Sequence, residues 1–429
     1  MKLLYIGDNR NRSNWGCRAT SIALRRLLDR IAPVSGVIYG KEVAAYSCTP
    51  TPINSLIPLK LFMFSYRNRN TRFFRDYVEF EKNFHLKMDY VTENVNESVR
   101  NFLKYKNFYP HLSEIYEFIE SCDALVFNGE GDIIFTTPPR RNHIFYLMII
   151  EIAHQLGKKI FYVNSMISPC PSTGINKKNY DQTITTLSKC SFVSVRDLES
   201  LSLLNKFNLN TKYGYIPDAL FTWFHYFDES SKLNLKNGDF LIPFPEKESY
   251  FGKLNLSKPY ICVGGSSLAA WDKEKAIPRY IELVNTLKNI GINTVLVQSC
   301  DGDVFLQKVA LSTNVPIVPV ETPILLAATV LANAQVFISG RYHPSIMASL
   351  GGTPCIFLGS NSHKTRSLQD VLEYENVVEF SAYPSLQECQ EILKMAQEML
   401  EEGEERRNKI LTVVKKLALE AESVATFIK

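Results

Sequence analysis

The sequence predicts an α/β protein with two doubly wound, Rossmann-like domains that face each other across a cleft. Three observations support this prediction: short apolar runs alternate with helical stretches, the alternation stops at residues 236–258 and then restarts, and polar residues follow several predicted strands. Ligands of such sheets bind beyond the carboxyl ends of the strands. We therefore expect the functional site at the cleft, where these polar residues would gather.

Composition narrows the class of protein. The chain has 429 residues, 45% of them hydrophobic, and a net charge of +4, which excludes a disordered chain and predicts no nucleic-acid partner. Its nine cysteines are scattered without a C-x-x-C pair, as expected for reduced thiols rather than disulfides or a zinc site. No apolar run reaches the ~20 residues of a membrane span, and the six residues before Gly7 are too few for a signal peptide. These features predict a cytoplasmic protein without a metal site.

Residues 1–235 form the first predicted domain. Its expected elements are strands at 2–6, 123–128, 159–163 and 192–195, and helices at 17–30, 143–157 and 197–205. The strand at 2–6 is followed by a polar loop and a helix, the order that opens an open α/β sheet. The strand at 123–128 is expected to end in a glycine loop at 129–131.

Residues 236–258 are expected to form a linker, because this stretch is rich in Ser, Lys, Asn and Pro and has little periodicity. Residues 259–384 form the second predicted domain, followed by a charged C-terminal helical segment at 385–429. The expected elements of the second domain are strands at 260–263, 294–298, 335–339 and 355–358, and helices at 275–289, 322–333 and 344–350.

The strongest candidate motif is Gly340-Arg341-Tyr342-His343, which lies between a predicted strand and a predicted helix. Arginine offers a planar fork that matches phosphate or carboxylate, and histidine can exchange a proton near neutral pH. The helix N-terminus beside them also favours an anion. The motif therefore predicts an anion site with acid–base capacity, although a surface arginine and a histidine at the strand end would explain the same residues.

A second candidate, Arg196-Asp197, follows the strand at 192–195. Asp197 could cap the next helix and pair with Arg196, which would make both residues structural. The alternative is that Arg196 is a second cation that points across the cleft at the same anion.

Acidic and amide side chains follow other strands. Asn128-Gly129-Glu130-Gly131-Asp132 lacks the G-x-G-x-x-G spacing of a dinucleotide site, and its carboxylates could orient sugar hydroxyls or act as a base. A turn with solvated acids is the competing interpretation. Asn14 lies in a loop near a helix N-terminus, and Asp218 ends a segment at the inter-domain edge where it could be only a turn.

Two further strings have weaker signals. Asp301-Gly302-Asp303 matches a D-x-D pattern that could ligate Mg²⁺, but an ordinary acidic turn is the favoured interpretation. The Arg67–Arg75 run interleaves arginines with aromatic residues and could touch a membrane surface or an anionic acceptor. A solvated loop is the favoured interpretation of this run.

Together these motifs resemble those of the polysaccharide pyruvyl transferase family. The resemblance rests on Asn14-x-Gly16, Asn128-Gly-Glu-Gly131, Arg196-Asp-x-x-Ser200, Pro217-Asp218 and Arg341-Tyr-His343, over about residues 1–360. It implies a fold like that of GT-B glycosyltransferases, phosphoenolpyruvate as donor, and a ketal formed on a sugar of a surface polysaccharide or its lipid-linked precursor. Two departures stand out: Cys17 replaces an aspartate found in many members, and residues 162–169 contain fewer glycines than usual.

The resemblance also implies site residues. The family's Arg-x-His motif and its earlier arginine hold the donor, a role that falls here to Arg341, His343 and Arg196, with Gly340 and Tyr342 adjoining them. The expected acceptor-binding residues are Asn14, Asn128, Gly129, Glu130 and Asp218. We expect residues 1–235 to bind the acceptor and residues 259–384 the donor.

In the expected reaction His343 is the general acid and Arg341 neutralises the leaving phosphate, so that no metal or cofactor is needed. Two alternatives remain: a glycosyltransferase that places Arg341 on the diphosphate of a sugar nucleotide, and a non-catalytic assembly protein that retains the fold. A lipid-linked acceptor would place the protein peripherally on the inner face of the membrane.

Overall fold

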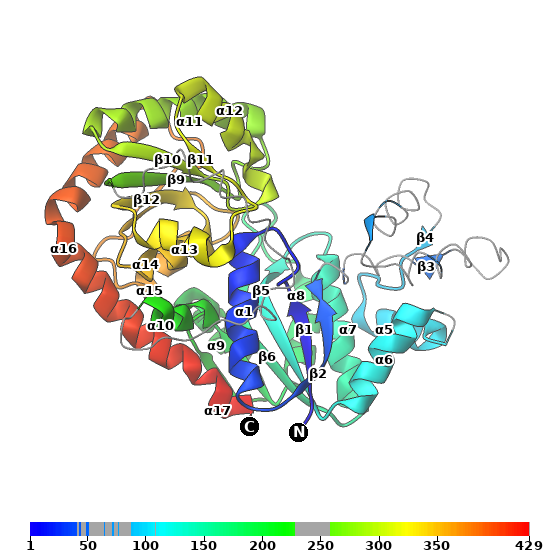
Figure 1. Cartoon of the computed structure of the whole chain (residues 1–429). Helices are drawn as coiled ribbons and strands as arrows, with labels where there is room; N and C mark the ends of the chain where they lie inside the picture. Colours follow the sequence, from blue (N-terminus) through cyan, green and yellow to red (C-terminus); the bar gives the residue numbers. More distant parts are fainter. Residues whose placement is uncertain are drawn as a thin grey trace.

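The computed structural model describes residues 1–40, 43, 49–50, 64, 71–72, 76, 87–107, 109–227 and 258–428. Within these ranges the chain forms two six-stranded parallel sheets, each covered by helices (Figure 1). The α/β fold class with two doubly wound units is confirmed. The predicted linker, apart from Lys258, and the Arg67–Arg75 run, apart from Thr71 and Arg72, lie outside the described residues.

The first sheet has the strand order β2-β1-β5-β6-β7-β8. Its strands are β1 (Leu3–Asp8), β2 (Val34–Tyr39), β5 (Ala124–Phe135), β6 (Lys159–Pro169), β7 (Phe192–Val195) and β8 (Tyr213–Tyr215). Its helices are α1 (Trp15–Asp29), α5 (Val95–Tyr105), α6 (Pro110–Ser121), α7 (Arg141–Gln155), α8 (Lys177–Leu187) and α9 (Leu198–Phe207). A short pair, β3 (Thr49–Pro50) and β4 (Lys87–Met88), lies apart from this sheet.

Alternate residues of β1 show why its sequence is a continuous apolar run. Leu3 and Tyr5 pack into a core that contains α1, whereas Leu4 and Ile6 pack into a second core with α5, α6 and α7. A parallel strand that is buried on both faces needs apolar residues at every position.

The second sheet has the order β11-β10-β9-β12-β13-β14, the arrangement of a dinucleotide-type Rossmann sheet. Its strands are β9 (Tyr260–Ser266), β10 (Asn293–Val297), β11 (Ile317–Val318), β12 (Val336–Gly340), β13 (Cys355–Leu358) and β14 (Glu379–Phe380). Its helices are α11 (Lys273–Leu287), α12 (Phe305–Thr313), α13 (Ile324–Ala332), α14 (Tyr342–Ser349) and α15 (Lys364–Val371).

One long helix crosses from the second sheet to the first. Helix α16 (Leu386–Glu422) packs on α11 near its start and on the short helix η1 (Ala219–Trp223), beyond β8, near its end, and α17 (Val424–Ile428) follows it. Figure 1 shows it in red along the flank of both units. The helix is kinked at Gly403, whose φ of 51° and ψ of −124° are not helical. Glycine tolerates this backbone without the steric penalty of a side chain.

Two strands run further than the sequence predicted. The residues expected as a glycine loop, 129–131, belong to β5, which continues to pair with β6 as far as Phe135 and Pro169. The register shifts between Glu130 and Ile133, so that one extra residue of β5 is accommodated as a bulge. Gly129 and Gly131 therefore lie at an irregularity within the strand, and the chain does not reverse its direction there.

Among the described residues, no helix combines the length and the apolar character that crossing a membrane would require. The cysteines in this part of the chain are unpaired thiols, and all of them except Cys17 are buried.

Candidate active site between the two sheets

The predicted site residues meet in a cleft of about 200 Å³ between the carboxyl ends of the two sheets. Residues after β1 and β7 and residues within β5 contribute to one wall, and residues after β9, β12 and β13 contribute to the other. Asn14, Glu130, Arg196, Arg341, Tyr342 and His343 line this cleft. Asn128, Gly129, Asp218 and Gly340 lie behind its surface, so their contribution is to hold the lining residues.

Arg196, Asp218 and His343 form a buried cluster that joins the two units. Arg196 Nη1 donates to Asp218 Oδ2 at 2.6 Å, and His343 Nε2 lies 3.2 Å from the same oxygen and 2.9 Å from Nη1. Arg196 Nη1 therefore lies within hydrogen-bond distance of both the Asp218 carboxylate and the His343 imidazole. Burial alone would raise the pKa of Asp218, but His343 and Arg196 outweigh it and hold that pKa well below its usual range.

Asp218 is thus more than the turn residue that its sequence position suggested. Its carboxylate is fully buried, and its second oxygen accepts a hydrogen bond from Thr20 Oγ1 at 2.7 Å. A carboxylate in this position can orient the imidazole of His343.

Tyr342 completes the wall around Arg196. The guanidinium carbon of Arg196 lies 4.5 Å from the centroid of the Tyr342 ring, which is within the range of a cation–π contact. The ring of Tyr342 also meets the ring of His343 edge to face at 5.2 Å. Tyr342 and His343, neighbours in one motif of the second unit, therefore both contact Arg196 of the first unit.

Arg341 is held by a different carboxylate. Its Nε donates to Asp303 Oδ1 at 3.1 Å, and Asp303 is fully buried and also accepts from Ser299 Oγ at 3.0 Å. The two carboxylates of the D-x-D string do not converge as a magnesium site would require, because Asp301 instead accepts from Ser13 Oγ at 2.9 Å. The string is a structural turn that fixes Arg341.

Hydrogen bonds between buried polar side chains link Asn128 of β5 to Asp218. Asn164 Nδ2 donates to Asn128 Oδ1 at 2.8 Å and to Thr20 Oγ1 at 2.9 Å, and Thr20 in turn reaches Asp218. Asn164 has a positive φ of 55°, a conformation that asparagine tolerates better than most residues. It stands in β6, in the segment 162–169.

The β5 bulge presents two carboxylates to the cleft. Glu130 has a φ of 38° and is almost fully buried, so it is not the solvated acid that the competing interpretation supposed. Asn9 Nδ2 donates to its Oε1 at 2.5 Å, and Asn128 Nδ2 lies 3.3 Å from the same atom. Burial and the neighbouring Glu130 raise the pKa of the adjacent Asp132 to about 6.

Lys364 is a site residue that the sequence reasoning missed. Its ammonium lines the cleft and donates to Ser267 Oγ at 2.9 Å and Asn361 Oδ1 at 2.8 Å. Burial, followed by the nearby Arg341 and Arg196, lowers its pKa to about 7. Its position shortly after the predicted strand 355–358 was a usable signal, because other site residues also follow strands.

Close contacts across the cleft keep the two walls in register. Gly16, at the start of α1, packs so tightly on α14 that a Cβ there would lie 2.6 Å from the Cβ of His343. Next to it, Trp15 Nε1 donates to the carbonyl of Val320 at 2.8 Å. The Asn14 side chain caps α1 by accepting from the amide of Cys17 at 3.2 Å. Asn14 therefore both lines the cleft and starts the helix that positions His343.

Asp197 acts as a helix cap, as one interpretation expected, but Arg196 does not pair with it. Asp197 Oδ1 accepts from the Ser200 amide at 2.8 Å and lies 3.0 Å from His363 Nε2 of the other unit. Glu199 Oε2 lies 3.5 Å from the second ring nitrogen of His363. His363, the residue before Lys364, thus contacts Asp197, the residue after Arg196.

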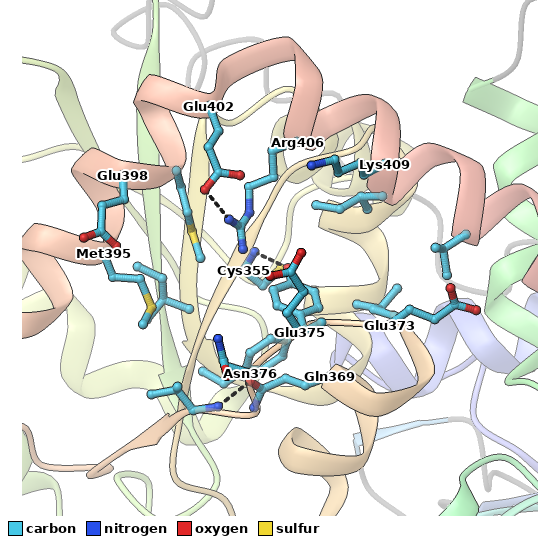
Figure 2. Close-up of a pocket in the computed structure, with 18 of the residues that line it drawn as sticks. Cys355, Gln369, Glu373, Glu375, Asn376, Met395, Glu398, Glu402, Arg406 and Lys409 are labelled. Carbon is cyan, nitrogen blue, oxygen red and sulfur yellow. Dashed lines mark hydrogen bonds and ion pairs between the residues drawn. The ribbon is translucent and has the colours of Figure 1, made fainter.

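A larger cavity of about 770 Å³ lies behind β13, against the kinked helix α16 (Figure 2). None of the predicted site residues lines it. Its charged side chains pair locally, as Glu402 and Arg406 do at 2.8 Å, and Tyr374 accepts from the Cys355 amide at 2.8 Å. The smaller cleft, with its converging cations and carboxylates, has the chemistry of an active site.

Comparison with known proteins identifies the family and supports the fold. A family model described as polysaccharide pyruvyl transferase matches residues 14–362, which is most of the chain. No curated protein sequence matches significantly.

Solved structures with this fold include UDP-GlcNAc 2-epimerases. The Neisseria meningitidis enzyme bound to UDP-GlcNAc has a TM-score of 0.54 and 13% identity, covering 97% of this chain and 98% of that one. A putative Listeria monocytogenes 2-epimerase has a TM-score of 0.54 and 12% identity, covering 100% of this chain and 95% of that one. At this identity the likeness extends to the two-domain GT-B architecture alone.

Proposed function

The chain belongs to the polysaccharide pyruvyl transferase family, and we propose that it transfers the pyruvyl group of phosphoenolpyruvate to a sugar as a ketal. The acceptor would be a surface polysaccharide or its lipid-linked precursor. Family membership indicates a transferase that acts on polysaccharide. The observation that carries the donor assignment is the convergence of Arg196, Arg341, His343 and Lys364 on one small cleft.

The charges of the cleft suit this donor. Arg196 and Arg341 are each paired with a buried carboxylate, whereas the hydrogen-bond partners of Lys364, Ser267 and Asn361, are both neutral. Phosphoenolpyruvate brings a phosphate and a carboxylate, so two guanidinium forks and one ammonium can divide its anionic groups between them.

The proposed chemistry begins with His343. Its imidazolium, oriented by Asp218, gives a proton to the methylene carbon of phosphoenolpyruvate, and the resulting cationic C2 is attacked by a sugar hydroxyl. The C2–phosphate bond then breaks while Arg341 and Lys364 neutralise the departing phosphate. A second hydroxyl attacks C2 and closes the ketal.

One alternative is less well supported by the cleft. A non-catalytic assembly protein would have no need for the buried cluster of Arg196, Asp218 and His343, in which every position is filled by an ionisable side chain.

Donor titration separates these possibilities. Calorimetry with phosphoenolpyruvate should show saturable binding to the full-length protein, and UDP-GlcNAc should not compete with it. Binding of UDP-GlcNAc without binding of phosphoenolpyruvate would favour the glycosyltransferase, and binding of neither would favour the assembly protein.

A further inference from the structure

The cleft has a carboxylate-bearing wall that the donor chemistry does not use. Arg341, His343 and Lys364 come from the second unit, whereas Glu130 and Asp132 come from the β5 bulge of the first unit. The first unit also contributes Arg12 and Arg196 to the lining, but both carboxylates among the described lining residues stand on its strand β5. The sugar acceptor is therefore expected on the side of the carboxylates.

The two carboxylates differ in their surroundings. Glu130 is held by the amide groups of Asn9 and Asn128, which both donate to its Oε1. Asp132 is partly exposed to the cleft and is hydrogen-bonded by Tyr146. Neighbouring carboxylates with different environments are the usual basis for dividing acid–base roles in an active site.

The backbone shows that this arrangement is built into the strand. The bulge places two residues of β5, Gly131 and Asp132, opposite the single residue Met166 of β6. Bulges next to active sites commonly redirect a side chain, and the positive φ of Glu130 is a sparsely populated conformation for that residue.

We propose that Asp132 is the general base that takes the proton from the attacking sugar hydroxyl, while Glu130 orients the sugar. This assignment rests on the proposed function. As the sugar oxygen forms its bond to C2, its O–H bond breaks and the proton passes to Asp132. Over a full turnover two hydroxyl protons leave the sugar, while the methylene carbon and the departing phosphate each gain one, so no co-reactant is needed.

The groups that face Asp132 determine its pH dependence. Glu130 raises the pKa of its carboxyl, Arg12 and Arg140 lower it, and Tyr146 donates a hydrogen bond to it. The thiol of Cys17 and the phenol of Tyr162 also lie within electrostatic range. With a pKa of about 6 the carboxylate is ionised at neutral pH, and kcat should fall as the pH drops through that value.

The test uses the isosteric variant Asp132→Asn. Ketal formation is measured with phosphoenolpyruvate and a panel of p-nitrophenyl glycosides of common hexoses and N-acetylhexosamines, with the fastest wild-type acceptor used for kinetics. We expect kcat to fall roughly 10²–10³-fold, with phosphoenolpyruvate affinity within about twofold of wild type and the acidic limb of the kcat profile abolished. Asp132→Glu, which retains a carboxylate, should recover part of the rate.

Asp181→Asn, an exposed aspartate on α8 that pairs with Lys177, is the matched control and should behave as wild type. An active wild-type protein with an Asp132→Asn kcat within about threefold, or with the acidic limb retained, would overturn the base assignment alone. A wild-type protein that consumes no phosphoenolpyruvate with any glycoside would overturn the proposed function as well.

Discussion

Arg196 Nη1 lies 2.6 Å from Asp218 Oδ2, and this ion pair is buried with side-chain exposures of 3% and 0%. Because His343 approaches the same oxygen at 3.2 Å, one carboxylate of the first unit controls cations from both units. The relationship therefore joins the two units at the proposed donor site. It also means that truncating either partner leaves a buried charge, which destabilises a protein by about 3–5 kcal/mol.

Replacing Arg341 with alanine should weaken phosphoenolpyruvate binding by about 1.5–3 kcal/mol, the range for hydrogen bonds to charged groups. Arg196→Ala should have a similar effect on affinity. Both changes should also lower stability, since Asp303 or Asp218 is left without its arginine. Calorimetry below the reduced Tm measures the affinity.

The double variant Arg341→Ala with Asp303→Asn distinguishes binding from folding. It should regain much of the lost stability, because the unpaired buried charge is removed, but not the donor affinity. Wild-type donor affinity in this double variant would show that Arg341 does not hold the donor.

His343→Gln should retain phosphoenolpyruvate binding and lose turnover by roughly 10²–10⁴-fold, since glutamine is polar but cannot deliver a proton at neutral pH. Calorimetry and steady-state ketal formation measure the two properties separately. A variant with normal kcat would leave His343 as a binding or structural residue.

Lys364 should make donor binding depend on pH. Its pKa of about 7 in the free protein means that the ammonium is lost as the pH rises above 7, whereas bound phosphate favours the charged form and raises that pKa. Phosphoenolpyruvate should therefore bind with uptake of about one proton at pH 8, and its Kd should rise with pH. Calorimetry in two buffers of different ionisation enthalpy measures the uptake.

Lys364→Met is the matching variant and should bind more weakly and take up no proton. Equal proton uptake by wild type and variant at pH 8 would assign the linked proton to another group.

Gly16→Ala should reduce both stability and turnover, because the added Cβ would lie 2.6 Å from His343 Cβ and push α1 from α14. Helix propensity alone would stabilise the variant by about 1 kcal/mol, so a loss of stability would have to come from the steric contact with His343. Gly214→Ala, where the structure shows no atom within 4 Å of the new Cβ, is the control. Thermal unfolding and kcat for both variants test this contact. Equal changes in Tm and kcat for the two variants would show that the contact with His343 does not constrain Gly16.

The alternation of apolar runs and helical stretches was sufficient to predict the fold. The predicted strand at 355–358 coincides with β13, and the strand predicted at 192–195 coincides with β7. Periodicity could not reveal that β5 continues through Gly129–Gly131, because a bulged strand has no regular pattern and depends on pairing with β6.

The residues that line the cleft were easier to predict than the carboxylates that pair with them. Arg341 and His343 could be proposed because they follow a strand, but their carboxylates, Asp303 and Asp218, lie 38 and 125 residues away along the chain. Such pairings depend on the packing of whole elements, and spacing along one sequence does not encode them. Lys364 was missed because a lone lysine in a polar loop has no distinctive pattern.

The central claim is that the protein builds a pyruvate ketal from phosphoenolpyruvate. Mass spectrometry of a lipid-linked or free glycan after incubation with wild-type protein and donor tests it most directly. The account predicts an added mass of roughly 70 Da on the acceptor, the group left when transfer is complete, together with release of phosphate. Transfer of a hexose mass from a sugar nucleotide, with no 70 Da product from phosphoenolpyruvate, would contradict it.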